Sequence, residues 1–195
     1  MEDWRIEKIT DPVFHRINGI SYRENDTIGI DDLRYLRLLH TGFDGQTHVG
    51  ELIVNQQIAA TIMDIMRTLY ENRYPIEKMR LVDEYGGDDN RSMEDNNSSA
   101  FNYRVIAGTS TLSRHSLGLA IDINPRFNPY IRPGKNGELI VEPPGSEAYT
   151  DRQAAFAHKI DEDDLCYRLF TRHGFIWGGS WSNVKDYQHF ETRSI

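Results

Sequence analysis

The stretch from residue 113 to residue 124, SRHSLGLAIDIN, constrains most strongly what this chain can fold into. Its second half alternates, so that Leu119, Ile121 and Ile123 share one face of an extended strand and the residues between them share the other. An acid, Asp122, stands at the centre of that second face. Because an unpaired carboxylate is costly to bury, this strand needs a cation or a hydrogen-bond donor beside Asp122.

A second polar segment lies near the C-terminus, at residues 186–191, DYQHFE. It adds the imidazole of His189 to that of His115 and to the carboxylate of Asp122. Two neutral nitrogen ligands and one anionic oxygen ligand suit a catalytic zinc site in which one coordination position is left for water. The spacing alone leaves alternatives, because Asp122 in such a strand also suits a core salt bridge. Other divalent ions accept the same ligands.

Together the two segments resemble a known family of bacterial cell-wall enzymes, the zinc D-alanyl-D-alanine carboxypeptidases and L-alanyl-D-glutamate endopeptidases, in its VanY-like branch. The resemblance rests on residues in both segments and just after the first: Ser113, His115, Gly118, Ala120, Asp122, Asn124, Pro125, Asn128, Pro129 and the segment 186–191. Residues 101–104 and the helical pattern at 58–70 also resemble this family, so the likeness covers roughly residues 50 to 191.

The resemblance implies a metallopeptidase that hydrolyses a peptide bond in the stem peptide of bacterial peptidoglycan. His115, Asp122 and His189 are then the ligands of one zinc ion, and a metal-activated water attacks the scissile carbonyl. Asp186 takes the place of the general base, where some relatives have glutamate. Arg104 takes the place of the group that stabilises the oxyanion.

The two catalytic assignments have alternatives within the chain. Glu191 shares a strand face with His189, so it is either the alternative base or an acceptor for a hydrogen bond from that ligand histidine. Asp186 lies three residues before His189, an offset that points strand side chains to opposite faces, so we expect Asp186 on a bend before the strand. Arg104 is alternatively the salt-bridge partner of the acidic segment 86–99.

Three further residues are candidates for substrate binding. Ser113 lies beside the first histidine, although a serine in a turn also has a purely structural explanation. Trp181 and Tyr187 flank the second segment, although aromatic side chains near a strand are often core residues. The pair at 178–179 is a glycine turn that we expect to let substrate approach the backbone.

Composition narrows the class of protein. The chain has 195 residues, of which 38% are hydrophobic and 27% charged, as expected for one soluble globular domain. A net charge of −8 without a basic patch argues against a nucleic-acid partner, and no apolar run is long enough for a transmembrane segment. The acidic start lacks a signal sequence, whereas a cell-wall substrate implies a periplasmic or extracellular protein; a cytoplasmic location stays open.

The patterns predict a single α+β domain with a central antiparallel sheet flanked by helices, and the resemblance implies a hedgehog/DD-peptidase-like fold. We expect residues 1–48 to form an N-terminal extension packed on a catalytic core of residues 49–195. Apolar residues at helical spacing predict a main helix over 58–69 and a second helix from Asp163 or Asp164 to 173. A short helix is expected over 31–40.

The sequence leaves alternatives open both within the enzyme class and outside it. Within the enzyme class, a D,D-carboxypeptidase and an L,D-type endopeptidase are both open. A second class is a wall-binding module that keeps zinc without hydrolysis, which the presence of both Asp186 and Arg104 disfavours. A third is a cytoplasmic zinc amidase acting on another small substrate. The sequence does not give the oligomeric state or the role of residues 1–48.

Overall fold

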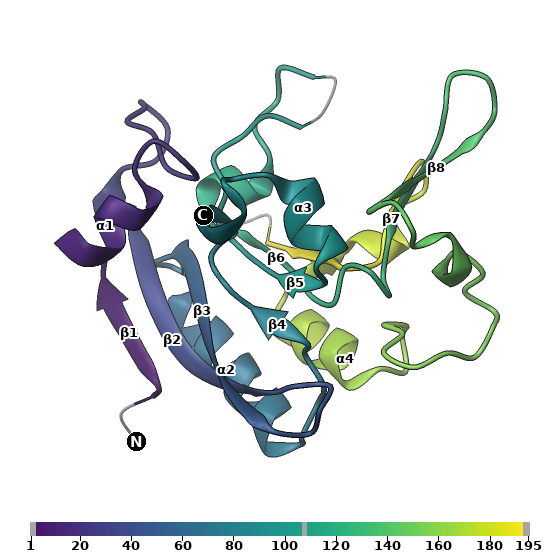
Figure 1. The fold of residues 1–195 in the computed structure, drawn as a ribbon, viewed down its shortest axis with the longest axis horizontal. Coiled ribbons are helices and arrows are strands. Elements are labelled where there is room, and N and C mark those ends of the chain that lie inside the picture. Colours follow the sequence, from purple (N-terminus) through teal and green to yellow (C-terminus); the bar gives the residue numbers. More distant parts are fainter. Residues whose placement is uncertain (1–2, 107–108, 193–195) are drawn as a thin grey trace.

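The computed structural model describes residues 3–106 and 109–192 (Figure 1). Its α-helices are α1 (Asp11–Ile17), α2 (Ala59–Glu71), α3 (Asp89–Glu94) and α4 (Leu165–Arg172). Its strands are β1 (Arg5–Lys8), β2 (Leu33–Thr41), β3 (Thr47–Asn55), β4 (Lys78–Met79), β5 (Asn97–Ser98), β6 (Ala120–Asp122), β7 (Tyr130–Pro133), β8 (Leu139–Glu142), β9 (Ile176–Trp177), β10 (Lys185–Asp186) and β11 (His189–Glu191).

The strands form small sheets, most of them antiparallel. β1, β2 and β3 make one sheet, β6, β11 and β9 a second, and β10, β7 and β8 a third, each in that spatial order. A parallel pair, β4 and β5, completes the described strands. Helices together with antiparallel sheets confirm the predicted α+β class. The antiparallel strands are divided among three sheets instead of meeting in one.

Helix α2 packs across one face of the first sheet, as Figure 1 shows. The predicted apolar positions of the helix are buried, and they meet buried residues of β2 and β3: Ile62, Ile65, Met66 and Leu69 on the helix, with Leu36, Leu38, Leu52 and Val54 on the strands. The main helix predicted from the sequence is therefore confirmed.

The short helix expected over residues 31–40 was wrong. Apart from a single 3-10 turn at Ile30–Asp32, this segment is the long strand β2, which pairs with β3 over nine residues and with β1 on its other edge. Leu33, Leu36 and Leu38 are all fully buried. The spacing of Leu33, Leu36 and Leu39 fits a helix face, but pairing along both edges of the strand decides the outcome.

The second sheet separates the core from the candidate site. On one face of β11, Phe190 stacks on Phe170 of α4, with ring centres 4.3 Å apart. Helix α4 begins after Asp164, whose carboxylate accepts a hydrogen bond from the backbone N–H of Cys166 at 2.8 Å, in line with the predicted second helix. Because neighbouring side chains of a strand point to opposite faces, His189 points away from this core.

The expected division at residue 48 stays a prediction. Residue 48 lies inside β3, which is paired along its length with β2. Within 3–106 and 109–192, no helix combines the length and the apolar character needed to cross a bilayer.

Candidate metal centre

His115 lies on a tight turn that is fixed at both ends. Residues Arg114–Leu117 form one 3-10 turn, and the hydroxyl of Ser113 accepts a hydrogen bond from the backbone N–H of His115 at 3.2 Å. Gly118 ends the turn in the left-handed region, with φ of 65°. A Cβ there would lie 2.5 Å from the backbone nitrogen of Asn55, so only glycine lets the turn pack this closely on β3.

Asp122 and His189 are direct neighbours across two antiparallel strands. The register of β6 and β11 places Asp122 opposite His189, and His189 Nδ1 lies 2.9 Å from Asp122 Oδ1. On the other side, the backbone of Asp122 exchanges two hydrogen bonds with Ser99, at 2.9 and 3.1 Å. Pairing on both sides therefore fixes the backbone that carries the carboxylate.

The three predicted ligands converge on one point. His115 Nε2 lies 3.2 Å from His189 Nδ1 and 3.2 Å from Asp122 Oδ2. One ligand atom from each residue lies within 4.8 Å of the other two. Tetrahedral zinc with ligands at about 2.0–2.2 Å places neighbouring ligand atoms roughly 3.3–3.5 Å apart, which is close to the observed separations. The donor set thus fits one metal ion.

In each imidazole, the nitrogen that points away from Asp122 is hydrogen-bonded, and this bond fixes the orientation of the ring. His115 Nδ1 donates to the backbone carbonyl of Ala100, since a carbonyl oxygen only accepts. His189 Nε2 lies 3.2 Å from Glu191 Oε2 and donates to it in the same way. When both rings are neutral, as metal ligation requires, their lone pairs therefore face Asp122. These acceptor atoms repel one another unless a proton or a metal ion lies between them. The outer partners, a backbone carbonyl and a carboxylate, are the groups that typically orient ligand histidines.

Electrostatics at this point favour a positive charge. Burial opposes ionisation of Asp122, but the neighbouring imidazoles of His115 and His189 hold the pKa of its carboxyl below the usual range. Burial also opposes a charged His189, yet hydrogen bonds to Asp122 and Glu191 raise the pKa of this imidazole to about 10. The carboxylates of Asp122 and Glu191, on either side of the His189 ring, therefore stabilise a positive charge there.

Asp186 lies close to this centre but in another sheet. It ends β10, opposite Tyr130 of β7, and the bend follows at residues 187–188. The bend was expected at Asp186 itself; hydrogen bonding to β7 instead keeps Asp186 in a strand. Its Oδ1 is buried and has no hydrogen-bond partner among the described residues. Burial, helped by the charge of Asp122 and opposed by that of His189, raises the pKa of Asp186 to about 7.

The raised pKa predicts a pH-dependent stability of the metal-free protein. The folded-state pKa of Asp186 is about 7, against an unfolded value of about 3.9. The stabilisation is therefore fully present below pH 4 and is lost as the pH rises to 7. With chelator present, we expect Asp186→Asn to raise the free energy of unfolding at pH 8, by at most about 4 kcal/mol, and to have little effect near pH 4. Thermal melts of the wild type and of Asp186→Asn across this pH range test the prediction. Equal Tm values for the two proteins at pH 8 would contradict it.

Arg104 contacts both the turn that carries His115 and the first residue of α3. Its backbone N–H donates to the hydroxyl of Ser116 at 2.8 Å, within the turn that carries His115. Its guanidinium forms an ion pair with Asp89 of α3, which also accepts a hydrogen bond from Asn102 at 2.7 Å. The alternative of a salt bridge with the acidic segment is thus what the structure contains. The oxyanion role of Arg104 stays a prediction.

The candidate substrate-binding residues differ in their surroundings. Trp181 is half-buried, and its ring centre lies 5.3 Å from that of His189. The ring of Tyr187 is covered by the guanidinium of Arg152 at 4.3 Å and packs near Trp177. Ser113 caps the His115 turn. Trp181 lines a surface pocket, and substrate binding by any of the three stays a prediction.

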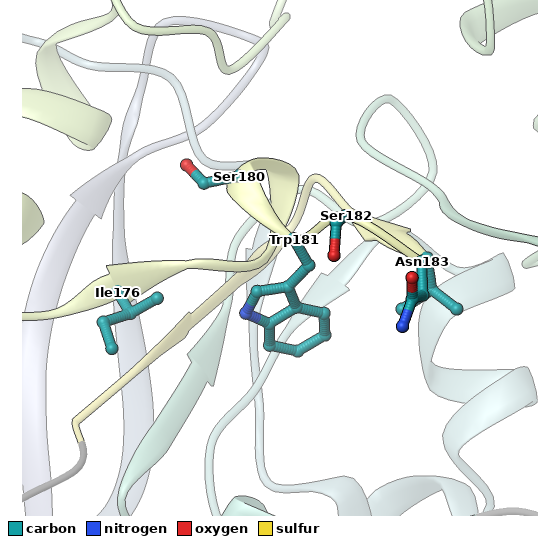
Figure 2. Close-up of a pocket in the computed structure, with 6 residues that line it drawn as sticks. Ile176, Ser180, Trp181, Ser182 and Asn183 are labelled. Carbon is teal, nitrogen blue, oxygen red and sulfur yellow. The ribbon is translucent and has the colours of Figure 1, made fainter.

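That pocket has a volume of about 670 Å³. Its lining residues come from β9 and from the segment between β9 and β10: Ile176, Ser180, Trp181, Ser182, Asn183 and Val184. Figure 2 shows the indole of Trp181 in the middle of the lining, with Ile176 to one side and Asn183 to the other.

The sequence analysis missed the role of Gly178. This glycine begins a 3-10 turn, and a Cβ on it would lie 2.6 Å from the backbone oxygen of Asp186 and 2.8 Å from its Cβ. The space beside Gly178 is therefore filled by Asp186, and substrate does not approach the backbone there as expected. The carbonyl of Ala100 was also missed, because no sequence pattern marks a backbone acceptor.

Comparison with known proteins agrees with this geometry. Residues 107–192 match the family model described as D-alanyl-D-alanine carboxypeptidase. The match contains both metal-centre segments, whereas the likeness at residues 58–70 and 101–104 lies outside it. No curated protein and no solved structure matches the chain at a significant level. Over residues 107–192 the chain is therefore similar to the D-alanyl-D-alanine carboxypeptidase family, which supports the resemblance found in the sequence.

Proposed function

We propose that this protein is a zinc-dependent peptidase that hydrolyses a peptide bond in the stem peptide of bacterial peptidoglycan. The observation that carries the proposal is the convergence of His115, Asp122 and His189, with both imidazoles oriented by acceptors behind them. The family match supports a peptidase and a wall peptide as substrate. Such a substrate places the protein at the cell wall, in the periplasm or outside the cell.

The donor set fits zinc by its chemistry, with two imidazole nitrogens and one carboxylate. Zinc bound there supplies a Lewis acid that polarises the scissile carbonyl and makes a water molecule acidic near neutral pH. The residues of the chain orient the ligands. The backbone carbonyl of Ala100 and the carboxylate of Glu191 fix the two imidazoles by hydrogen bonds, and the pairing of β6 with β11 holds Asp122 beside them.

Asp186 is the proposed general base and acid. It takes a proton from the attacking water and delivers it to the departing amine. In the metal-free protein burial raises the pKa of this carboxyl to about 7, and its buried Oδ1 has no hydrogen-bond partner among the described residues, so this oxygen is available to accept a proton. Arg104, held by Asp89 through Nε, is the proposed donor to the developing oxyanion.

A zinc-containing wall-binding module without activity is the second candidate. A module that only binds has no use for a buried carboxyl close to the metal centre, and burial of Asp186 costs stability at neutral pH. This observation favours the enzyme. Carboxypeptidase and endopeptidase activity are both compatible with the metal centre, since each needs the same chemistry at the carbonyl.

Removal of the metal tests the proposal. We expect the purified protein to cleave peptidoglycan stem peptides, to lose this activity with a chelator, and to regain it with about one equivalent of zinc per chain. Mass spectrometry of the products identifies the bond. Undiminished cleavage after complete metal removal, or no cleavage by the zinc-loaded protein, would reject the peptidase.

Gly178→Ala is expected to lower kcat by up to about 100-fold, because a displacement of a catalytic group by about 1 Å has effects of this size. The φ of Gly178 is not in the left-handed region, so alanine is disfavoured only by its contact with Asp186. Zinc content should stay at the wild-type level. Gly29→Ala is the matched control, since its Cβ would approach only the Asp32 side chain, at 3.3 Å. Wild-type kcat in Gly178→Ala would show that this packing does not position Asp186.

A further inference from the structure

The pocket beside Trp181 has a lining unlike the rest of this acidic chain. None of its six residues is charged, although charged residues make up 27% of the sequence. The side chains of Ser180, Ser182 and Asn183 are exposed and have no hydrogen-bond partner among residues 3–106 and 109–192. The pocket thus combines an indole face with two free hydroxyls and one free amide.

This chemistry selects one class of ligand. An indole face packs well against the apolar C–H face of a sugar ring, while hydroxyl and amide groups pair with sugar hydroxyls and acetamido groups. A terminal carboxylate requires a cation, and the lining has none. The cation nearest in sequence, Lys185, donates to the backbone oxygen of Gly179 at 3.0 Å. The lining therefore fits a neutral amino sugar better than a charged peptide end.

Resting on the proposed function, we infer that this pocket is a subsite for an amino-sugar ring of the glycan that carries the stem peptide. The Trp181 ring centre lies 5.3 Å from that of His189. An extended peptide spans about 3.3–3.6 Å per residue, so a sugar stacked on the indole lies within a few residues of a bond at the metal centre. The substrate is then a glycan-bearing peptide cut near its sugar end.

Direct binding tests the subsite without any hydrolysis. The probe is the disaccharide N-acetylglucosaminyl-N-acetylmuramic acid amide, titrated by calorimetry against the zinc-loaded full chain. We expect saturable binding that Trp181→Ala weakens by about tenfold or more and Asn183→Ala weakens less. Asn136→Ala, an exposed asparagine in the turn between β7 and β8, is the matched control and should bind as wild type. Absence of saturable binding, or equal binding by Trp181→Ala, overturns the subsite. If Trp181→Ala does not fold, the same titration is made with Trp181→Phe and Asn183→Ala. Weaker binding by these variants supports the subsite, and wild-type binding by both overturns it.

Kinetics with two substrates separate this inference from the proposed function. We expect kcat/KM for the disaccharide pentapeptide to exceed that for the free pentapeptide by about tenfold or more, with the ratio falling toward one in Asn183→Ala. Equal rates on both substrates without disaccharide binding overturn the subsite and leave the peptidase intact. Disaccharide binding without hydrolysis of either substrate supports the subsite and contradicts the peptidase.

Discussion

Replacing Asp186 with asparagine lowers kcat for stem-peptide hydrolysis by about 10²–10⁴-fold, the range that general acid–base groups contribute, while zinc content stays at one ion per chain. Asparagine keeps the size of the side chain but neither accepts nor delivers a proton near neutral pH. Asp186 is not among the three converging ligands, so its loss leaves the metal centre complete. Steady-state kinetics with metal analysis of the same samples give both quantities.

The matched control for that variant is Asp83→Asn. Asp83 is another carboxyl whose pKa is raised by burial, and it bonds the backbone and hydroxyl of Ser21. We expect this variant to lose stability but to keep kcat, because Asp83 has no part in the metal centre. An active Asp186→Asn enzyme would move the role of the base to Glu191, which Glu191→Gln then tests.

Replacing His189 with alanine should remove both zinc and activity. Even outer partners of ligand histidines change metal affinity by about 10–100-fold, so loss of a ligand should weaken binding by more than roughly 100-fold. His115→Ala should behave in the same way. Zinc dissociation constants from competition with a chromophoric chelator measure the effect.

His173→Ala is the control for those two variants. His173 caps the C-terminal end of α4, where Nδ1 lies 2.8 Å from the backbone oxygen of Leu169. Wild-type zinc affinity and activity are expected. If His189→Ala and His173→Ala bind zinc equally well, His189 is not a ligand.

The metal ligands were predicted mainly from the family resemblance, because their spacing alone leaves alternatives, but strand alternation is a local property and predicted the surroundings of Asp122. The run from 119 to 123 fixes which face Asp122 occupies, and Asp122 of β6 then lies opposite His189 of β11. The helices α2 and α4 were predictable for the same reason, since their apolar spacing and the cap at Asp164 lie within each segment.

Features that depend on distant contacts were not predictable. The leucines of residues 33–39 suit a helix or a strand, and only β1 and β3 decide between them. Arg104 meets Asp89 because of where α3 packs, and the division into three sheets follows from bends such as that at 187–188. Gly178 matters only once β10 lies against it.

Crystals of the zinc-loaded protein, measured at the zinc absorption edge, test the central claim most directly. The account predicts one strong anomalous peak within about 2.0–2.2 Å of His115 Nε2, His189 Nδ1 and an oxygen of Asp122. A structure of the zinc-loaded protein without a peak at this point, or with the ion held by other residues, would contradict it.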